Sequence, residues 1–212
     1  MLARFLSALR WRYAVKEFDA KKKVAAGDLA SLLEAARLSP SSLGLQPFKI
    51  VVVENKAARQ LILEKACDQP KVVVAPYLLV FCTYQKYDRA FVDRFIDRFA
   101  AARHLGEEKV VNLRKARRSF ITKTPFKELD EWAGQQAFLA LGTLLSAAAF
   151  SRIDACPMGG FKPAELDTVL NLKKYNLHSR VLCTVGYRSA SDKEAKQAKV
   201  RRPTDELIVR IR

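Results

Sequence analysis

Apolar residues recur at helical spacing through much of the chain, and this spacing gives way to continuous apolar runs at three places. The stretches with helical spacing predict helices at residues 2–9, 28–37, 56–66, 88–118, 129–150 and 163–170. Asp28 is expected to cap the second helix, which ends at Ser39 because a residue before proline disfavours the helical region. The apolar runs predict buried strands, the first of them buried on both faces: FKIVVV (48–53), YLLVFCT (77–83) and VLCTVG (181–186).

Three other segments bear on how the chain packs. The second half of the predicted helix 129–150, FLALGTLLSAAAF, is apolar on nearly all sides, which is typical of burial all round, at the centre of a fold or in a dimer interface. CPMGGF (156–161) predicts a tight glycine-rich loop, and residues 206–211 predict a strand-like tail that can pair with another chain. No repeat or linker divides the sequence, so residues 1–212 are expected to form a single α+β domain.

The net charge is the most unusual property of the composition. The 212 residues include 38 Lys and Arg against 22 Asp and Glu, a formal charge of +16. A surplus that large indicates an anionic partner: a small ligand, nucleic acid or a membrane surface. No uninterrupted apolar run reaches the roughly 18 residues that a membrane-spanning helix needs, so no integral membrane contact is expected.

Nucleic acid is the weaker explanation of this charge. The basic residues are densest at 114–118 and 193–199, but no nucleic-acid-binding motif or aromatic stacking platform accompanies them. We therefore expect at most a weak, salt-sensitive association with nucleic acid.

The cysteines and histidines predict neither disulfides nor a metal site. Cys82 and Cys183 lie inside apolar runs, and none of the four cysteines has a short-range partner, which favours buried, reduced thiols. His104 and His178 have no second ligand at metal-binding spacing.

Several polar groups interrupt the apolar pattern in a way that suits an anionic, planar cofactor. Arg12 and Lys16 stand four residues apart, and Lys199 and Arg201 lie two apart near the end of the chain. Such cations can bind a phosphate, and the glycines of the 157–160 segment leave backbone N–H groups open to ring atoms. Each group alone is weak evidence for a cofactor site. A pair of basic residues usually lies on a solvated face, and a pair of glycines usually forms a turn.

The order of the motifs is more specific than any one of them. RYAVKEFD, SPSSLGLQPF, EWAGQQ, CPM before GFKP, and KVRRP follow one another along the chain. This order resembles the FMN-dependent nitroreductase family, and most closely its oxygen-insensitive NAD(P)H nitroreductase branch. The resemblance covers essentially the whole chain. It implies a central, mostly antiparallel sheet flanked by helices, in an intertwined homodimer with exchanged C-terminal tails and FMN bound non-covalently at the interface.

The resemblance also implies roles for individual residues. Arg12, Lys199 and Arg201 would contact the flavin phosphate, and Lys16 would lie near the pyrimidine edge of the ring. The backbone N–H of Gly159 or Gly160 would face flavin N5, so no catalytic side chain is required. The partner subunit would contribute Pro40, Ser41 and Ser42. The remaining positions expected at the cofactor are Tyr13, Ala14, Gly44, Lys71, Gln136, Pro157 and Met158.

The activity implied is ping-pong reduction of nitroaromatics, quinones or similar electron-poor acceptors, with NADH or NADPH as the donor. Some family positions differ: Tyr13-Ala14 replaces a polar pair, and Gly159 replaces a Glu, so substrate preference stays open. The alternatives are another flavin reaction (enone reduction, dehalogenation or flavin cleavage), a flavin binder with little turnover, or a basic protein that binds nucleic acid or an anionic surface.

The first sixteen residues contain no acid, as in a mitochondrial transit peptide, but they also carry the apolar stripe of an ordinary first helix. Cleavage there would remove Arg12 and Lys16. We therefore expect the segment to be retained and the protein to be cytoplasmic, with uncleaved organelle targeting as the alternative.

Overall fold

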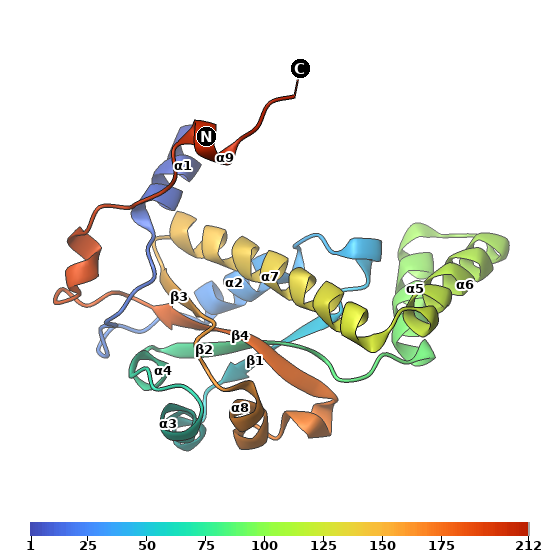
Figure 1. Ribbon diagram of the computed structural model, residues 1–212, viewed down its shortest axis with the longest axis horizontal. Helices are drawn as coiled ribbons and strands as arrows, with labels where there is room; N and C mark the ends of the chain where they lie inside the picture. Colours follow the sequence, from blue (N-terminus) through green and yellow to red (C-terminus); the bar gives the residue numbers. More distant parts are fainter. Residues whose placement is uncertain (212) are drawn as a thin grey trace.

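One antiparallel sheet of four strands forms the centre of the computed structural model, which describes residues 1–211. The strands are β1 (Phe48–Val53), β2 (Tyr77–Tyr84), β3 (Asp154–Met158) and β4 (Leu177–Gly186), arranged in the order β1-β2-β4-β3. All three pairings are antiparallel (Figure 1). The three strands expected from the apolar runs are confirmed, although β2 and β4 extend beyond them, and the α+β class is confirmed with them.

Two expectations about the strands are wrong, and sheet position explains both. CPM at 156–158 belongs to β3 rather than to a loop, because β3 is an edge strand and an edge tolerates Pro157. β1 is not buried on both faces: it forms the other edge, and most of its side chains are only partly buried.

The helices match most of the sequence pattern. Their bounds are α1 (Leu2–Trp11), α2 (Ala26–Arg37), α3 (Lys56–Lys65), α4 (Lys71–Val74), α5 (Arg89–Arg103), α6 (Glu107–Lys123), α7 (Phe126–Phe150), α8 (Pro163–Val169) and α9 (Thr204–Leu207). Short 3-10 turns occupy Ser42–Gly44, Leu172–Tyr175 and Lys193–Lys196. Asp28 does not cap α2, because the helix starts earlier and Ala25 holds the cap position.

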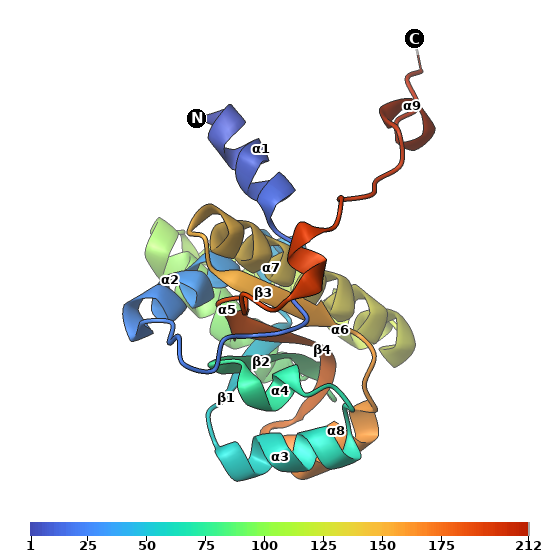
Figure 2. The same ribbon diagram turned by 90° about the vertical axis from the view of Figure 1, so that its left-hand side faces the viewer.

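Two predicted elements have a different form. The single helix expected at 88–118 is a hairpin of α5 and α6, because His104 takes a left-handed conformation (φ 49°) that ends α5. The tail at 206–211 forms no strand within the described residues. Its first two residues end the short helix α9, and the rest extends away from the body of the protein, on the side from which α1 also projects (Figure 2).

Helices cover both faces of the sheet (Figure 1). One core lies between the sheet and α3, α4 and α8, and it includes Leu78, Val80 and Leu182. The other lies under α2 and α7, where Leu79 and Phe81 meet Leu144. The α5–α6 hairpin packs around a smaller apolar cluster with the beginning of α7.

By length and composition alone, helix α7 could cross a membrane, although the sequence has no uninterrupted apolar run of that length. Half of its most apolar window is buried inside the protein, as in a core helix. The helix is not buried all round, however. Phe138, Leu139 and Phe150 are exposed on its outer side, where they line an open groove with Leu2 and Phe5 of α1.

Candidate functional site

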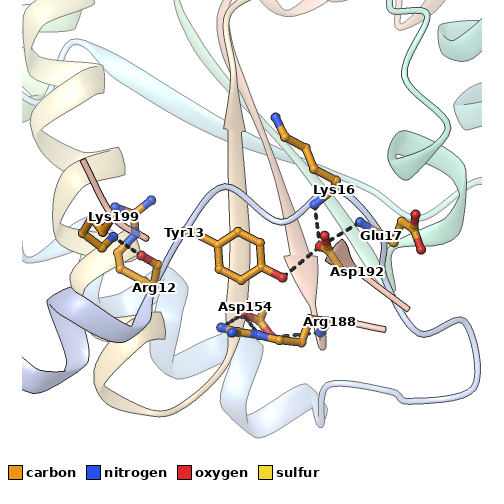
Figure 3. Close-up of polar contacts among 8 residues, drawn as sticks. All are labelled: Arg12, Tyr13, Lys16, Glu17, Asp154, Arg188, Asp192 and Lys199. Carbon is orange, nitrogen blue, oxygen red and sulfur yellow. Dashed lines mark hydrogen bonds and ion pairs between the residues drawn. The ribbon is translucent and has the colours of Figure 1, made fainter. Parts of the chain in front are cut away.

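The residues that follow α1 meet the C-terminal segment beside β3. Arg12 takes an extended conformation that ends the helix, and its carbonyl accepts a hydrogen bond from the Lys199 ammonium (Figure 3). A cavity of about 650 Å³ opens between the two segments. Its lining includes the predicted residues Arg12, Tyr13, Ala14, Lys16, Lys199 and Arg201, together with Arg10 and Arg188. The structure therefore brings the N-terminal and C-terminal cations of the motif together.

The cations at this cavity repel one another. Burial, and then the neighbouring charge of Arg201, lowers the pKa of Arg12. Burial together with Arg12 and Arg201 lowers the pKa of Lys199. Among the described residues, Arg12, Lys199 and Arg201 form no ion pair with a carboxylate, although Glu194 lines the same cavity. An arrangement of like charges without matching acids favours the binding of an anion.

Lys71 is a further cation, outside the lining of this cavity. It begins α4 and is only 8% exposed, yet it has no carboxylate partner within the described part of the chain. Burial raises the pKa of the Cys156 thiol, while the positive charges of Lys71, Lys16 and Arg12 act against this rise. All three cations therefore act on the Cys156 thiol, and two of them, Arg12 and Lys16, line the cavity.

The α4 turn that carries Lys71 is held by a buried arginine. Arg59 of α3 donates hydrogen bonds to the backbone carbonyls of Val72 (2.6 Å), Pro76 (3.1 Å) and Ala75. These carbonyls accept the charge-assisted bonds of the guanidinium, which satisfies a cation that is 5% exposed. Arg59 thus fixes the position of Lys71 without taking part in the cavity.

The glycine loop after β3 lies against the segment that leads to Lys71. The N–H of Lys162 donates to the carbonyl of Ala66 (2.7 Å), and the Gln69 amide donates to the carbonyl of Gly160 (3.2 Å). A Cβ atom added to Gly159 would meet nothing within 4 Å, so the space beside that residue is open. Within the described residues, the N–H groups of Gly159 and Gly160 donate no hydrogen bond and are free to face a ligand.

Pro157 and Met158 lie in β3, and Met158 is buried in the core rather than facing the cavity. Tyr13 lines the cavity and is held from within the protein. Its hydroxyl donates a hydrogen bond to Asp192 (2.8 Å), which fixes the side chain within the protein.

The loop with Pro40, Ser41, Ser42 and Gly44 forms a second group, at a distance from the first. The Ser42 N–H donates to Oε1 of Gln136 (2.8 Å), and the Gln136 amide donates to the carbonyl of Trp132 (3.0 Å). Gln136 therefore holds the loop against α7, with both ends of its amide bonded within the chain. The light-blue turn at 42–44 lies near α5, on the side of the molecule opposite α1 (Figure 1). Within the described residues, no hydrogen bond joins this loop to Arg12.

Sequence reasoning missed the acids that hold the cavity wall. Asp154 pairs with Arg188, whose guanidinium lies over the rings of Trp11 and Tyr13, and Asp192 accepts hydrogen bonds from the 13–17 segment. These partners are far apart in the sequence, so no spacing rule reveals them. The available signal was the presence of two acids, Asp192 and Glu194, within a mostly basic segment.

All four cysteines, Cys67, Cys82, Cys156 and Cys183, are buried free thiols, as expected from the sequence.

Comparison with known proteins agrees with this geometry. A model of the nitroreductase family matches residues 9–187. A candidate NAD(P)H nitroreductase of Staphylococcus epidermidis is 31% identical, over 96% of this chain and 94% of that protein. The major NAD(P)H-flavin oxidoreductase of Aliivibrio fischeri is 32% identical, over 93% of this chain and 94% of that protein.

Solved structures show the same fold. The crystal structure of a candidate nitroreductase from Exiguobacterium sibiricum in complex with FMN has a TM-score of 0.82 at 18% identity, with 98% of this chain and 97% of that chain covered. Because the family match spans most of the sequence and includes the Arg12, Lys71 and Gly159 segments, the chain belongs to the nitroreductase family and is an oxidoreductase of that family.

Proposed function

We propose that the protein binds FMN non-covalently at the cavity beside Arg12 and uses NADH or NADPH to reduce nitroaromatics, quinones or similar electron-poor acceptors. The observation that carries this proposal is the single cavity lined by Arg12, Lys16, Lys199 and Arg201, with the buried Lys71 as a further cation that acts on Cys156. These five residues are named the cation cluster below. A set of cations at one cavity that forms no ion pair with a carboxylate among the described residues fits a phosphorylated ligand.

The residues present fit FMN in particular. Arg12, Lys199 and Arg201 would hold its phosphate, because a guanidinium can donate two parallel hydrogen bonds to phosphate oxygens. Lys16 and Lys71 would lie toward the polar edge of the flavin ring, and the N–H groups of Gly159 and Gly160 would face its central nitrogen. The FMN-bound protein of Exiguobacterium sibiricum with the same fold supports this choice of cofactor.

Bound FMN would supply the redox chemistry, by accepting hydride from NAD(P)H and passing electrons to the acceptor in a ping-pong cycle. The chain itself would bind and orient the cofactor. Fixed cations at Lys16 and Lys71 favour negative charge on the ring, so they would raise its reduction potential. The buried residues behind the cavity, among them Cys156 and Met158, exclude water from that side.

We also propose that the functional unit is a homodimer with exchanged C-terminal tails. The Ser41–Ser42 loop does not meet the cation cluster within one chain, so a complete site needs this loop from a second copy. Two surfaces suit such an assembly. One is the apolar groove between α1 and α7, and the other is the unpaired edge of β1. The tail exposes Leu207, Ile208 and Val209, which would be buried on another copy.

The structure gives little support to the alternative that the protein binds nucleic acid. Arg114 pairs with Asp93 and Asp97, and Arg118 pairs with Asp93 at 2.5 Å, so the densest basic stretch is partly neutralised. Other flavin reactions stay open as alternatives, since no described residue dictates the acceptor. The cytoplasmic location stays a prediction.

The test is a flavin titration of the purified protein, the variant Arg12→Ala and the control Lys173→Ala, whose side chain is exposed and remote from the cavity. The wild type and the control should bind one FMN per chain, and anaerobic NADPH or NADH should bleach the flavin absorbance. A nitroaromatic or a quinone should then restore it. Arg12→Ala should bind FMN at least tenfold more weakly. A wild-type protein that takes up no FMN would overturn the proposal.

A further inference from the structure

The carboxylate of Asp192 is the point at which the two sides of the cavity are joined. Its Oδ2 atom accepts hydrogen bonds from the Tyr13 hydroxyl (2.8 Å), the Lys16 N–H (2.9 Å) and the Glu17 N–H (3.1 Å) (Figure 3). Its Oδ1 atom accepts one from the Glu194 N–H (3.1 Å). The residue is only 2% exposed, so these protein donors replace water around the charge.

These hydrogen bonds act on the backbone that carries two members of the cation cluster. Oδ2 holds the N–H of Lys16 itself, and Tyr13 is the residue next to Arg12. From Asp192 the chain continues through the 3-10 turn Lys193–Lys196 to Lys199 and Arg201. One carboxylate therefore sets how the 12–16 segment lies against the segment that carries the other two cations.

The contacts around Asp192 strengthen the same junction. The Ser189 N–H donates to the carbonyl of Glu17 (2.9 Å), and the Ser191 hydroxyl donates to the Glu17 carboxylate (2.7 Å). Arg188 lies 4.5 Å from the centre of the Tyr13 ring. The Tyr13 side chain is thus held on its face by a cation and at its hydroxyl by Asp192, which leaves it one position.

The electrostatics fit a permanently ionised group. Burial would raise the pKa of Asp192, but hydrogen bonds from the N–H groups of Glu17 and Lys16 and from the Tyr13 hydroxyl outweigh it, so the pKa lies below the usual value. A neutral amide would lose the charge and one of the two acceptor oxygens. One of its two ends is an NH₂ group, which would face N–H donors instead of accepting from them.

We propose that Asp192 is a positioning residue of the phosphate site: it holds Arg12 at the spacing from Lys199 and Arg201 that a flavin phosphate requires, and so makes the site select FMN over riboflavin. This inference rests on the proposed function. Asp192 contacts neither cofactor nor substrate in it, and acts only through the two segments that it joins.

The preference between the two flavins separates positioning from general stabilisation. FMN and riboflavin share the ring system, and only FMN has the phosphate. A loss of fold would weaken both ligands alike, whereas a displacement of Arg12 from Lys199 and Arg201 would weaken FMN alone. The ratio of the two dissociation constants is therefore the quantity to measure.

The experiment titrates wild type, Asp192→Asn, Tyr13→Phe, Arg12→Ala and the control Glu165→Gln with FMN and with riboflavin. Glu165 is an exposed acid on α8, remote from the cavity. Asp192→Asn should bind FMN about tenfold more weakly and riboflavin within twofold of wild type. Tyr13→Phe, which removes one of the donors to Asp192, should shift the same ratio by less, and Glu165→Gln should not shift it.

Equal losses for both flavins, or no loss in Asp192→Asn while Arg12→Ala loses FMN, would overturn the inference and leave the proposed function standing. A wild type that binds no FMN would overturn both. Should Asp192→Asn fail to fold, Tyr13→Phe decides: an unchanged ratio in this variant counts against the inference.

Discussion

The ammonium group of Lys199 donates a hydrogen bond to the backbone carbonyl of Arg12, so a cation from the end of the chain lies directly against a cation from its beginning (Figure 3). Burial and the charges of Arg12 and Arg201 lower the pKa of Lys199. The repulsion between these positive charges persists while no anion is bound. A bound phosphate would reverse the sign of the field that Lys199 experiences, which links its protonation to the cofactor.

The first prediction concerns the pH dependence of FMN binding. Only the protonated form of Lys199 attracts the phosphate. Because its pKa is lowered, the proton should be lost at a lower pH than for an ordinary lysine. We therefore expect FMN affinity to be highest near neutral pH and to fall, by about tenfold, as pH rises through that lowered pKa. Fluorescence titration of FMN at a series of pH values from neutral upward measures this.

The matched control is Lys199→Arg, because a guanidinium keeps its charge throughout this range. Its FMN affinity should stay flat where that of the wild type falls. A wild-type curve as flat as that of the variant would show that Lys199 does not contribute its charge to the site.

The second prediction concerns the buried ion pair beside the cavity. Asp154 is 4% exposed and accepts hydrogen bonds from the Arg188 side chain (2.5 and 2.9 Å) and from the Arg188 N–H (2.8 Å). Asp154→Asn leaves a guanidinium without its counter-ion, so the free energy of unfolding should fall by about 3–5 kcal/mol. Urea unfolding monitored by circular dichroism gives the value.

Glu34→Gln is the control for this variant, because Glu34 and Arg37 form the same kind of ion pair on the exposed side of α2. Solvent screens that pair, so no measurable change is expected. Similar unfolding curves for the two variants would mean that the Asp154 pair contributes no more than a surface pair.

Much of the sheet could be predicted from the sequence, because β2 and β4 carry continuous β-branched and aromatic runs that only burial explains. β3 could not, since its Pro157 and the glycines that follow it are also typical of a loop. The tail shows the opposite error. Its composition is strand-like, but within the described residues it pairs with no strand, and it forms part of the helix α9 and an extended end instead.

The candidate site likewise contains residues that the sequence predicted and residues that it did not. Motif order placed Arg12, Lys16 and Lys199 correctly around one cavity, because each motif lies next to a secondary-structure element that positions it. Asp192 and Arg188 were missed, because their contacts form only when the end of the chain folds back on its beginning. That Gln136 lies at the cofactor stays a prediction; within one chain its side-chain oxygen accepts a hydrogen bond from the Ser42 N–H.

The third prediction concerns Gly44 in the loop that Gln136 holds. Its φ of +71° is unfavourable for other residues, and an added Cβ would lie 2.9 Å from the Phe95 ring. Gly44→Ala should therefore lower the free energy of unfolding by about 1–3 kcal/mol. The cost should be smaller when Phe95→Leu is present as well, since the smaller side chain removes part of the clash but not the backbone strain.

Gly27→Ala serves as the control, because a Cβ at that helical position meets nothing within 4 Å. Thermal unfolding should show this variant as stable as the wild type or slightly more stable, since alanine favours the helix. If Gly44→Ala is equally harmless, the loop must adopt another conformation in solution.

The last prediction tests the homodimer through the outer face of α7. Phe138 and Leu139 are 54% and 49% exposed in one chain, and with α1 they form an apolar groove that a second copy would cover. Phe138→Glu would bury a charge in that contact, at a cost well above that of a surface substitution. Light scattering after size-exclusion chromatography should therefore find a dimer for the wild type and a monomer for the variant. FMN affinity should fall as the dimer is lost, because the partner's Ser41–Ser42 loop leaves the site.

Val111→Glu places the same charge at a comparably exposed apolar position on α6, and this control should remain a dimer that binds FMN. A wild-type monomer that holds FMN at full stoichiometry would show that one chain forms the site alone, and the groove on α7 would then need a different partner.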